Sequence, residues 1–434
     1  MFKITTSTSK QKILFSIDYL GNSQELYFKG SRLNTASLGD AAFCAFLPIA
    51  MKKGLSLSID RPVSKQLAIN SQAIQAIYST WFNDMTTVDI NLKQGSVTKR
   101  GSKVASFFSC GIDSLDTLLS HFEEIDYLVY VEGYDVWPHE KSYLKFMRQK
   151  IREAAKLYKK EVIFITTNLH LELDTHIRWG DQYHGAALAT VAHLLPADIG
   201  KVYIPSTFTY SSLLAWGSHP ILDPLWSSSS LQIVHDGAAK TRPEKVLNVY
   251  NDKTNIAPKF VRVCLGDRTS GDYNCSVCGK CTRTLVAIDL LNFGNKAKTF
   301  KKYKNFQSLL DQFTDSEVEF MHTGETIQYF RKGQVTYDSD KLALLESKFK
   351  DMTKVGFTSA YYDSYDKFIP TDLIYRAKLS DHIKEAAVGH KDNAIDKAKK
   401  TKALIVSGKS AAIKLYSGQN IVRLKHIKKC FKKH

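Results

Sequence analysis

One stretch, Ala105–Leu119, constrains the fold of this chain more than any other part of its sequence. It begins with apolar residues typical of a buried strand, continues through a turn of small residues and leads directly into an amphipathic helix. A turn that leads straight into a helix directs free backbone N–H groups and the positive helix end at one place. The hydroxyls of Ser109 and Ser114 can add further donors there. The stretch therefore predicts a phosphate-binding turn, with an ordinary strand-to-helix turn as the alternative.

Strands and helices alternate on both sides of this stretch along the chain. Strand-like runs at 104–108, 127–131, 161–166 and 201–205 are separated by helical patterns at 114–123, 140–158 and 181–195. Such alternation predicts an α/β fold with a doubly wound parallel sheet, whose ligands bind at the carboxyl ends of the strands. Asp135 follows the second of these strands, where a nucleotide base or a metal-binding carboxylate would lie; a turn-capping role is the alternative.

The regions on either side of this pattern are organised differently. Residues 1–100 read as an N-terminal α+β domain, residues 101–294 as the sheet domain, and residues 295–434 as a C-terminal helical region with a basic tail. The formal net charge is +17, and residues 397–434 contain twelve lysines and arginines and no acidic residue. Most of the positive charge therefore lies in the tail and not in the sheet domain. It predicts that the tail binds nucleic acid or an acidic protein, and a solvated terminus is the alternative.

Four of the seven cysteines lie in the pattern Cys264-(x10)-Cys275-x2-Cys278-x2-Cys281. Thiolates at this spacing can close a tetrahedron around Zn²⁺, which predicts a structural zinc-binding loop without an open coordination position. A disulfide arrangement, incidental thiols and an iron–sulfur cluster are the alternatives. Free thiols, the lack of a signal-peptide pattern and the lack of an apolar run of about 18 residues lead us to expect a cytoplasmic protein that does not span a membrane.

The motifs also resemble those of a known superfamily. The spacing Ser109-x-Gly111-x-Asp113-Ser114 is similar to the Ser-Gly-Gly-x-Asp-Ser loop of the PP-loop ATP pyrophosphatases, with Cys110 in place of the first glycine. Together with the cysteine pattern, it resembles the 7-cyano-7-deazaguanine synthases over about residues 103–290. The sequence around these motifs more closely resembles enlarged synthase-like relatives, including those associated with bacterial antiviral defence operons.

The resemblance implies a Rossmann-like fold of the HUP kind and a reaction in which ATP activates a carboxylate and yields AMP and pyrophosphate. ATP, Mg²⁺ and Zn²⁺ are the implied cofactors, and a 7-carboxy-7-deazaguanine or a related carboxylate is the implied substrate. The product would be a nitrile or an amide, and the acceptor of the activated group could be a protein.

The candidate residues follow from these two lines of reasoning. For catalysis they are Asp113, Ser114 and, by resemblance, Lys240. The nucleotide-binding candidates are Ser109, Cys110, Gly111, Ile112, Asp113, Ser114 and Asp135. The substrate-binding candidates are His184, Ser206, Tyr210, His219 and Asp223. Packing inside the protein is the alternative role for His184, and an anchoring role is the alternative for Tyr210.

Two other functions fit the same sequence. A PP-loop enzyme that thiolates tRNA or joins lysine to it would use the basic tail to hold RNA; a thiolase also needs a reactive thiol near the loop, where Cys110 is the one cysteine. A nucleotide-binding scaffold without turnover would result if Cys110 weakens the phosphate loop.

Overall fold

The computed structural model describes residues 1–9, 11–19, 22–95, 99–264, 273–313, 317–333 and 335–354, and two short strands further on. The chain divides into two compact units, Met1–Pro370 and Thr371–His434. In the second unit, β13 (Ile413–Lys414) pairs antiparallel with β14 (Ile421–Val422). The rest of the predicted basic tail lies outside the described residues.

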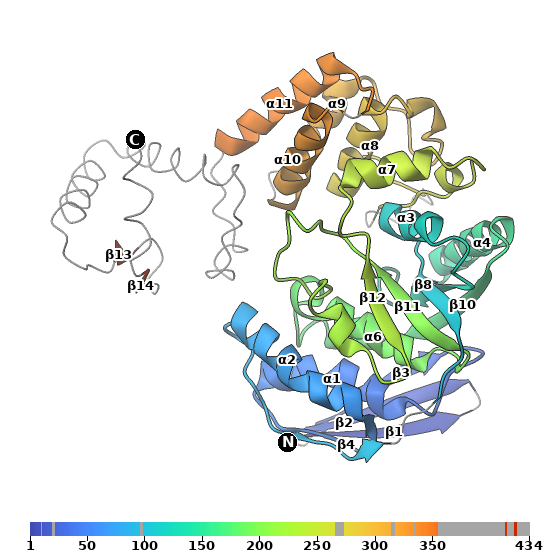
Figure 1. The fold of residues 1–434 in the computed structure, drawn as a ribbon, viewed down its shortest axis with the longest axis vertical. Helices are drawn as coiled ribbons and strands as arrows, with labels where there is room; N and C mark the ends of the chain where they lie inside the picture. The colour runs from blue at the N-terminus through green and yellow to red at the C-terminus, as the bar shows by residue number, and fades with distance from the viewer. Residues whose placement is uncertain are drawn as a thin grey trace. The chain divides into compact units, whose positions relative to one another are not determined.

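A large, mostly parallel sheet forms the centre of the first unit (Figure 1). Its strand order is β12-β11-β8-β9-β10-β3-β2-β1-β4-β6. The parallel half consists of β8 (Lys103–Phe107), β9 (Tyr127–Glu132), β10 (Glu161–Thr167), β11 (Ile199–Pro205) and β12 (Gln232–Asp236). All six residues of β9 are buried, as expected for a strand covered on both faces. The predicted α/β class is confirmed by this arrangement.

Antiparallel strands from the amino-terminal region extend the same sheet. They are β1 (Phe2–Ser9), β2 (Lys12–Tyr19) and β3 (Asn22–Lys29). The last of them joins the parallel half through Thr166, which pairs with Lys29. Two short strands, β4 (Leu57–Ile59) and β6 (Ile90–Asn91), complete the edge, and β5 (Val63–Ser64) pairs separately with β7 (Gln94–Gly95). One sheet therefore includes strands from both sides of residue 100, where the sequence predicts a domain boundary.

Helices cover both faces of the sheet (Figure 1). One face carries α1 (Leu38–Lys53), α2 (Lys65–Trp81) and α6 (His184–Leu194). Small residues in α1 and α6 let these two helices pack closely, and α1 is buried along most of its length. The other face carries α3 (Ile112–Ser120) and α4 (Lys141–Leu157), and α7 (Arg242–Tyr250) packs on α3. In α4, Leu144, Met147 and Ile151 form the buried stripe while the charged residues face outward.

The described part of the carboxyl-terminal region is helical. It contains α8 (Gly279–Leu290), α9 (Phe306–Leu310), α10 (Glu317–Arg331) and α11 (Ser339–Lys354). Shorter elements are α5 (Leu169–Leu173) and the irregular turns η1 (Trp179–Tyr183), η2 (Asp223–Trp226), η3 (Ala257–Lys259) and η4 (Gly294–Lys296). Among the helices that the structure describes, none has the length and apolarity needed to cross a membrane.

Candidate functional site

The turn between β8 and α3 has the geometry that the sequence predicts for this stretch. The helix begins at Ile112, and Gly111 precedes it in an extended conformation without a side-chain cap. The Ser114 hydroxyl donates to the Gly111 carbonyl (3.0 Å) and accepts from the Ser109 backbone N–H (3.3 Å). The two serines thereby fix the turn at the carboxyl end of β8, where a ligand of a doubly wound sheet binds.

Cys110 adopts a left-handed backbone conformation, with φ of 63°. Glycine occupies this region without steric penalty, whereas a residue with a Cβ costs about 1 kcal/mol or more there. The thiol is fully buried, and burial raises its pKa to about 12. A thiol with this pKa is protonated at neutral pH and is therefore a poor nucleophile. This environment disfavours a thiolation reaction that depends on Cys110.

A cavity of about 120 Å³ lies at the start of α3. Its lining combines the turn residues Ser109, Gly111, Ile112 and Asp113 with Asp135 from the end of β9. Four cationic side chains complete the wall: Arg242, Arg262, Lys280 and Arg283. Cations thus outnumber carboxylates around a small, partly open space, which is the electrostatic requirement for binding an anion. We call this space the anion cavity.

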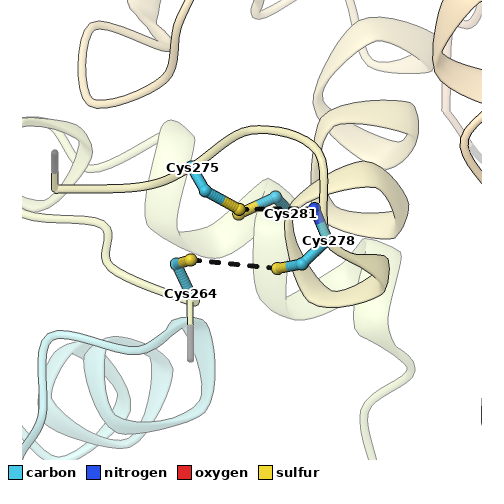
Figure 2. A group of neighbouring side chains, drawn as sticks. All are labelled: Cys264, Cys275, Cys278 and Cys281. Carbon is cyan, nitrogen blue, oxygen red and sulfur yellow. Dashed lines mark hydrogen bonds between the residues drawn. The ribbon is translucent and has the colours of Figure 1, made fainter. Parts of the chain in front are cut away.

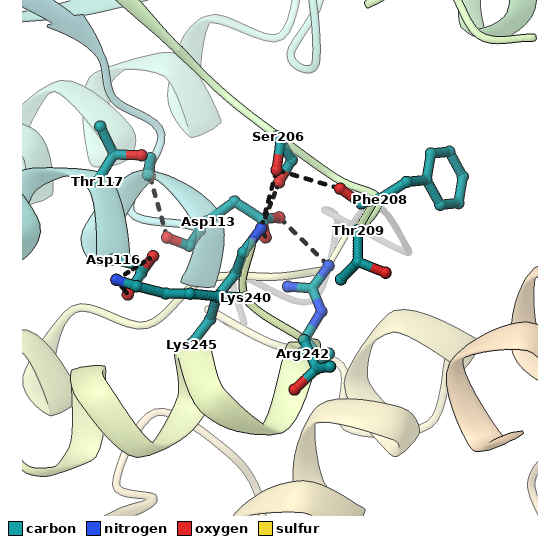
Figure 3. A network of polar contacts seen from close by, with 12 residues as sticks. Asp113, Asp116, Thr117, Ser206, Phe208, Thr209, Lys240, Arg242 and Lys245 are labelled. Carbon is teal, nitrogen blue, oxygen red and sulfur yellow. Dashed lines mark hydrogen bonds and ion pairs between the residues drawn. The ribbon is translucent and has the colours of Figure 1, made fainter. Parts of the chain in front are cut away.

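Asp113 lies between two cations at this cavity (Figure 3). Its carboxylate is 3.1 Å from the Lys245 ammonium and 3.2 Å from the Arg242 guanidinium. Burial raises the pKa of Asp113, but the attraction of Arg242 and Lys245 outweighs this effect and lowers the pKa to about 2. Lys245 also donates to the Ser206 carbonyl (2.7 Å) at the end of β11. Asp113 is therefore ionised at neutral pH and holds two cations in fixed positions.

Arg262 contributes a guanidinium whose bonding is incomplete. The side chain is only 3% exposed, and its Nε donates to the Tyr143 hydroxyl (3.1 Å). Within the described part of the chain, the Nη2 atom of Arg262 and the Nε atom of Arg242 are buried without a hydrogen-bond partner. Buried polar groups are nearly always paired, so unpaired donors on two arginines that line the cavity favour an anionic partner.

The four predicted zinc ligands lie together (Figure 2). The sulfurs of Cys264 and Cys278 are 3.9 Å apart, as are those of Cys275 and Cys281, and all four ligand atoms lie within 4.8 Å of one another. A tetrahedral zinc–thiolate site has sulfurs about 3.8 Å apart, given Zn–S bonds of about 2.3 Å. The cysteines are free thiols, so a disulfide arrangement is not formed. The cluster can therefore hold a metal ion such as zinc.

The cysteine cluster is joined to the anion cavity through α8. This helix begins directly after Cys278, and its first two turns place Lys280 and Arg283 at the cavity wall. Arg283 forms an ion pair with Glu319 of α10, with 2.9 Å between Nη1 and Oε1. A Cβ on Gly279 would lie 2.6 Å from the Glu319 carboxylate, so a larger residue here would push this carboxylate away from its position beside Arg283. A metal ion on the cysteines would thus fix two of the four cavity cations.

Lys240 lies elsewhere, although the sequence makes it the catalytic lysine. Its ammonium binds the Asp116 carboxylate (2.9 and 3.1 Å) and the Ser120 hydroxyl (2.6 Å) on α3 (Figure 3). The lysine next to Asp113 is Lys245, one turn into α7. That helix starts with a capping box made by Thr241 and Glu244, and this is the signal that could have placed Arg242 and Lys245 on one helical face.

The remaining cations of the cavity have only weak sequence signals. Lys280 and Arg283 are spaced to share a face of the helix that follows the cysteine pattern. Arg262 lies in an irregular segment and has no such pattern. It reaches the cavity because its backbone N–H donates to the Cys110 carbonyl (2.8 Å).

Most of the predicted substrate residues are not at the anion cavity. Ser206 directly precedes Thr207, which lines the cavity. Tyr210 is 63% exposed, and the Nδ1–H of the His184 ring donates to the Gly180 carbonyl (2.8 Å). Asp223 is fully buried and accepts hydrogen bonds from internal groups, among them the Ser218 hydroxyl (2.6 Å).

His219 belongs to the same buried network as Asp223. Its backbone N–H donates to the Asp223 carboxylate (3.3 Å), and its ring packs edge-on against Trp81. Burial and the nearby His235 lower the pKa of His219 to about 4. The imidazole is therefore neutral at pH 7. A substrate-binding role for His184, Tyr210, His219 and Asp223 stays a prediction, and three of the four have partners inside the protein.

Comparison with known proteins adds nothing to this description. No family model, curated protein or solved structure matches the chain.

Proposed function

We propose that this chain is an ATP-dependent ligase that transfers AMP to a carboxylate and then forms a carbon–nitrogen bond. The observation that carries the proposal is the anion cavity, where the free amino end of α3 and four cationic side chains meet beside an ionised aspartate. A volume of about 120 Å³ holds several water molecules. It suits a pyrophosphate group, while the nucleoside and the carboxylate would lie outside the cavity.

The proposed chemistry makes use of this charge distribution. A carboxylate oxygen of the substrate attacks the α-phosphorus of ATP, the bond to the β-phosphate oxygen breaks, and pyrophosphate leaves. The negative charge that develops on the leaving group is stabilised by the guanidiniums of Arg242 and Arg262, which are already oriented in the folded protein. An amine or ammonia then attacks the activated carbonyl carbon, loses a proton, and displaces AMP to give an amide.

The other residues of the cavity have supporting roles in this proposal. Ser109 and the α3 backbone N–H groups orient the phosphates, and Asp113 holds Lys245 and Arg242 in place through its ion pairs. Asp113 and Asp135 supply carboxylate oxygens, the ligands that Mg²⁺ prefers, so this donor set fits a magnesium ion bound together with ATP. Such an ion would neutralise further phosphate charge.

The resemblance to the 7-cyano-7-deazaguanine synthases supports a more specific proposal for the substrate. It makes a 7-carboxy-7-deazaguanine, or a related planar carboxylate, the first acid to test, with ammonia or the amino group of a protein as acceptor. Conversion to a nitrile would require a second activation, in which the amide oxygen is removed in the same way. Participation in bacterial antiviral defence belongs to the same proposal.

Formation of AMP and pyrophosphate from ATP tests this function. Purified protein would be incubated with ATP, Mg²⁺ and each member of a panel of carboxylates that includes 7-carboxy-7-deazaguanine, with ammonia, and the nucleotides separated by chromatography. We expect AMP with one carboxylate only. The Lys245→Ala variant should lose about 100-fold in rate, because Asp113 loses the partner that holds it in position at the cavity, and a misplacement of about 1 Å can cost this much.

Lys240→Ala removes the same charge from the neighbouring lysine and serves as the comparison. Because its ammonium is bound to Asp116 and Ser120, this variant should lose much less activity than Lys245→Ala. Production of ADP instead of AMP, or equal losses in the two variants, would contradict the proposed mechanism.

A further inference from the structure

A second charged region lies on the opposite side of the sheet from α1 and α2. It is a groove of about 820 Å³ between α4 and the strands β10, β3 and β2. Its lining includes Lys12, Lys29, Arg148 and Arg152. In the antiparallel strands, Ile13 and Phe28 point into the core, so their neighbours Lys12 and Lys29 point to the opposite face. We call this region the basic groove.

The charge of the basic groove is mostly unpaired. Arg148 binds the buried carboxylate of Glu132 through two nitrogens. In contrast, no carboxylate of the described residues forms an ion pair with Lys12, Lys29 or Arg152. Three cations that converge on one concave surface without an acidic partner repel one another, and an anionic ligand would relieve this repulsion.

Aromatic rings lie beside these cations. The guanidinium carbons of Arg148 and Arg152 are 5.3 and 5.0 Å from the centre of the Phe164 ring, which lines the groove. The ammonium groups of Lys12 and Lys29 are 5.7 and 4.9 Å from the centre of the Tyr27 ring. Guanidinium planes and aromatic rings are the surfaces on which nucleic-acid bases stack, and the ammonium groups match phosphates.

The rest of the lining is polar. Ser9, Gln11, Ser31 and Thr166 offer hydroxyl and amide groups that both donate and accept hydrogen bonds, as recognition of a ribose 2′-hydroxyl requires. Val162 and Phe164 are the apolar side chains of the lining, whereas a stable protein interface has a larger apolar centre. We propose that the basic groove binds single-stranded RNA.

This inference goes beyond the adenylation chemistry and does not depend on it. The two regions are nevertheless close along the chain, because Arg148 holds Glu132 at the end of β9 and Asp135, three residues further on, lines the anion cavity.

The inference is tested by the anisotropy of a fluorescein-labelled oligouridine of about 20 nucleotides, longer than a typical single-strand site. The full chain is titrated at about 0.1 M salt, where exposed charges are partly screened. The test variant is Lys12→Ala/Lys29→Ala/Arg152→Ala. The matched control is Lys65→Ala/Lys259→Ala/Lys304→Ala, which removes the same charge from exposed lysines away from the groove. The basic carboxyl-terminal tail is intact in both, so its contribution to binding is the same.

We expect the groove variant to bind the oligouridine about tenfold more weakly or worse. The magnitude of the slope of log K against log salt should decrease by about 2, because three phosphate contacts are lost. The control should bind within about twofold of the unmodified protein, as surface charges far from the ligand are screened. Equal effects of the two triple variants would overturn the proposal. So would equal binding of the corresponding DNA, or groove-dependent binding of polyglutamate without binding of RNA.

Discussion

At the scale of single residues, Asp113 organises the anion cavity through its two ion pairs. The carboxylate is partly exposed, whereas Lys245 and Arg242 are buried, and each of these cations would lose charge compensation without it. Removing one member of such a group is strongly destabilising, since the remaining charges lose their compensation. The aspartate thus has a structural effect that is measurable in the absence of any ligand.

The pH dependence of stability tests this effect. The folded pKa of Asp113 is about 2, below the ordinary value of about 3.9 for aspartate. A carboxyl group with a lowered pKa in the folded state stabilises the fold at pH values above its ordinary pKa. This stabilisation is lost as the pH falls through the folded pKa. The Asp113→Asn variant should therefore unfold about 2 kcal/mol more easily at pH 7. This difference should shrink between about pH 4 and pH 2, as the native carboxylate becomes protonated.

The measurement is denaturant unfolding of both proteins across this pH range. Asp18→Asn, at an exposed position of β2, is the control and should change the free energy of unfolding by less than about 0.5 kcal/mol. A difference for Asp113→Asn that stays constant down to pH 2 would show that the ion pairs do not hold the carboxylate ionised.

Cys110 permits a second test at this scale. Its φ of 63° is strained for any residue with a Cβ and most strained for a β-branched one. Cys110→Val should therefore lower the free energy of unfolding by about 2 kcal/mol or more. In Cys110→Gly, relief of the strain offsets the loss of a small buried side chain, so the change should stay within about 1 kcal/mol. Thermal and denaturant unfolding measure both, and a more stable valine variant would contradict the assigned backbone conformation.

At the scale of elements, α8 connects the cysteine cluster to the cavity. Its first residue follows Cys278, and it carries Lys280 and Arg283. A metal ion bound to the four thiolates would stabilise α8 strongly, because the free energy of metal binding adds to the free energy of folding.

We therefore expect one zinc ion per chain in elemental analysis, and loss of order in α8 when a chelator or Cys278→Ser removes it. Hydrogen exchange in residues 279–290 should rise, while exchange in β9 should stay slow because that strand is buried on both faces. Retention of full protection in α8 without metal would show that the cluster does not organise the cavity.

The sequence was most informative for elements with a strong local pattern. Four of the five strands of the parallel half were predicted within two residues because they are largely apolar runs, whereas β12 was not predicted. The turn before α3 was predicted from its small residues. The strand β1 was missed, because its period-two alternation of Ile and Phe with Ser and Thr begins at the first residues without a turn signal.

The cation set of the cavity could not be predicted in this way. Arg242, Arg262 and Arg283 come from segments far apart in the sequence, and only the fold brings them together. The two lysines near α7 show most clearly what the sequence could not predict. Lys240 and Lys245 are five residues apart, but because α7 begins between them, Lys240 binds Asp116 and Lys245 binds Asp113.

At the scale of the whole molecule, one continuous sheet carries both proposed sites. Its parallel half ends at the anion cavity, and its antiparallel extension forms the floor of the basic groove. The join is the pairing of β10 with β3, so the amino-terminal strands belong to the same framework as the cavity. A ligand in the groove and a nucleotide in the cavity would therefore be held by one rigid element.

The most direct test of the account is calorimetric titration of the protein with pyrophosphate, because it probes the anion cavity without knowledge of the carboxylate. The account predicts binding at one site per chain, and weakening by about tenfold or more in Arg262→Gln, where a buried charge-assisted hydrogen bond is lost. Lys304→Gln, at an exposed position, should bind as the unmodified protein does. Absence of binding, or equal affinity of all three proteins while Arg262→Gln remains folded by circular dichroism, would contradict the assignment of the cavity as a phosphate site.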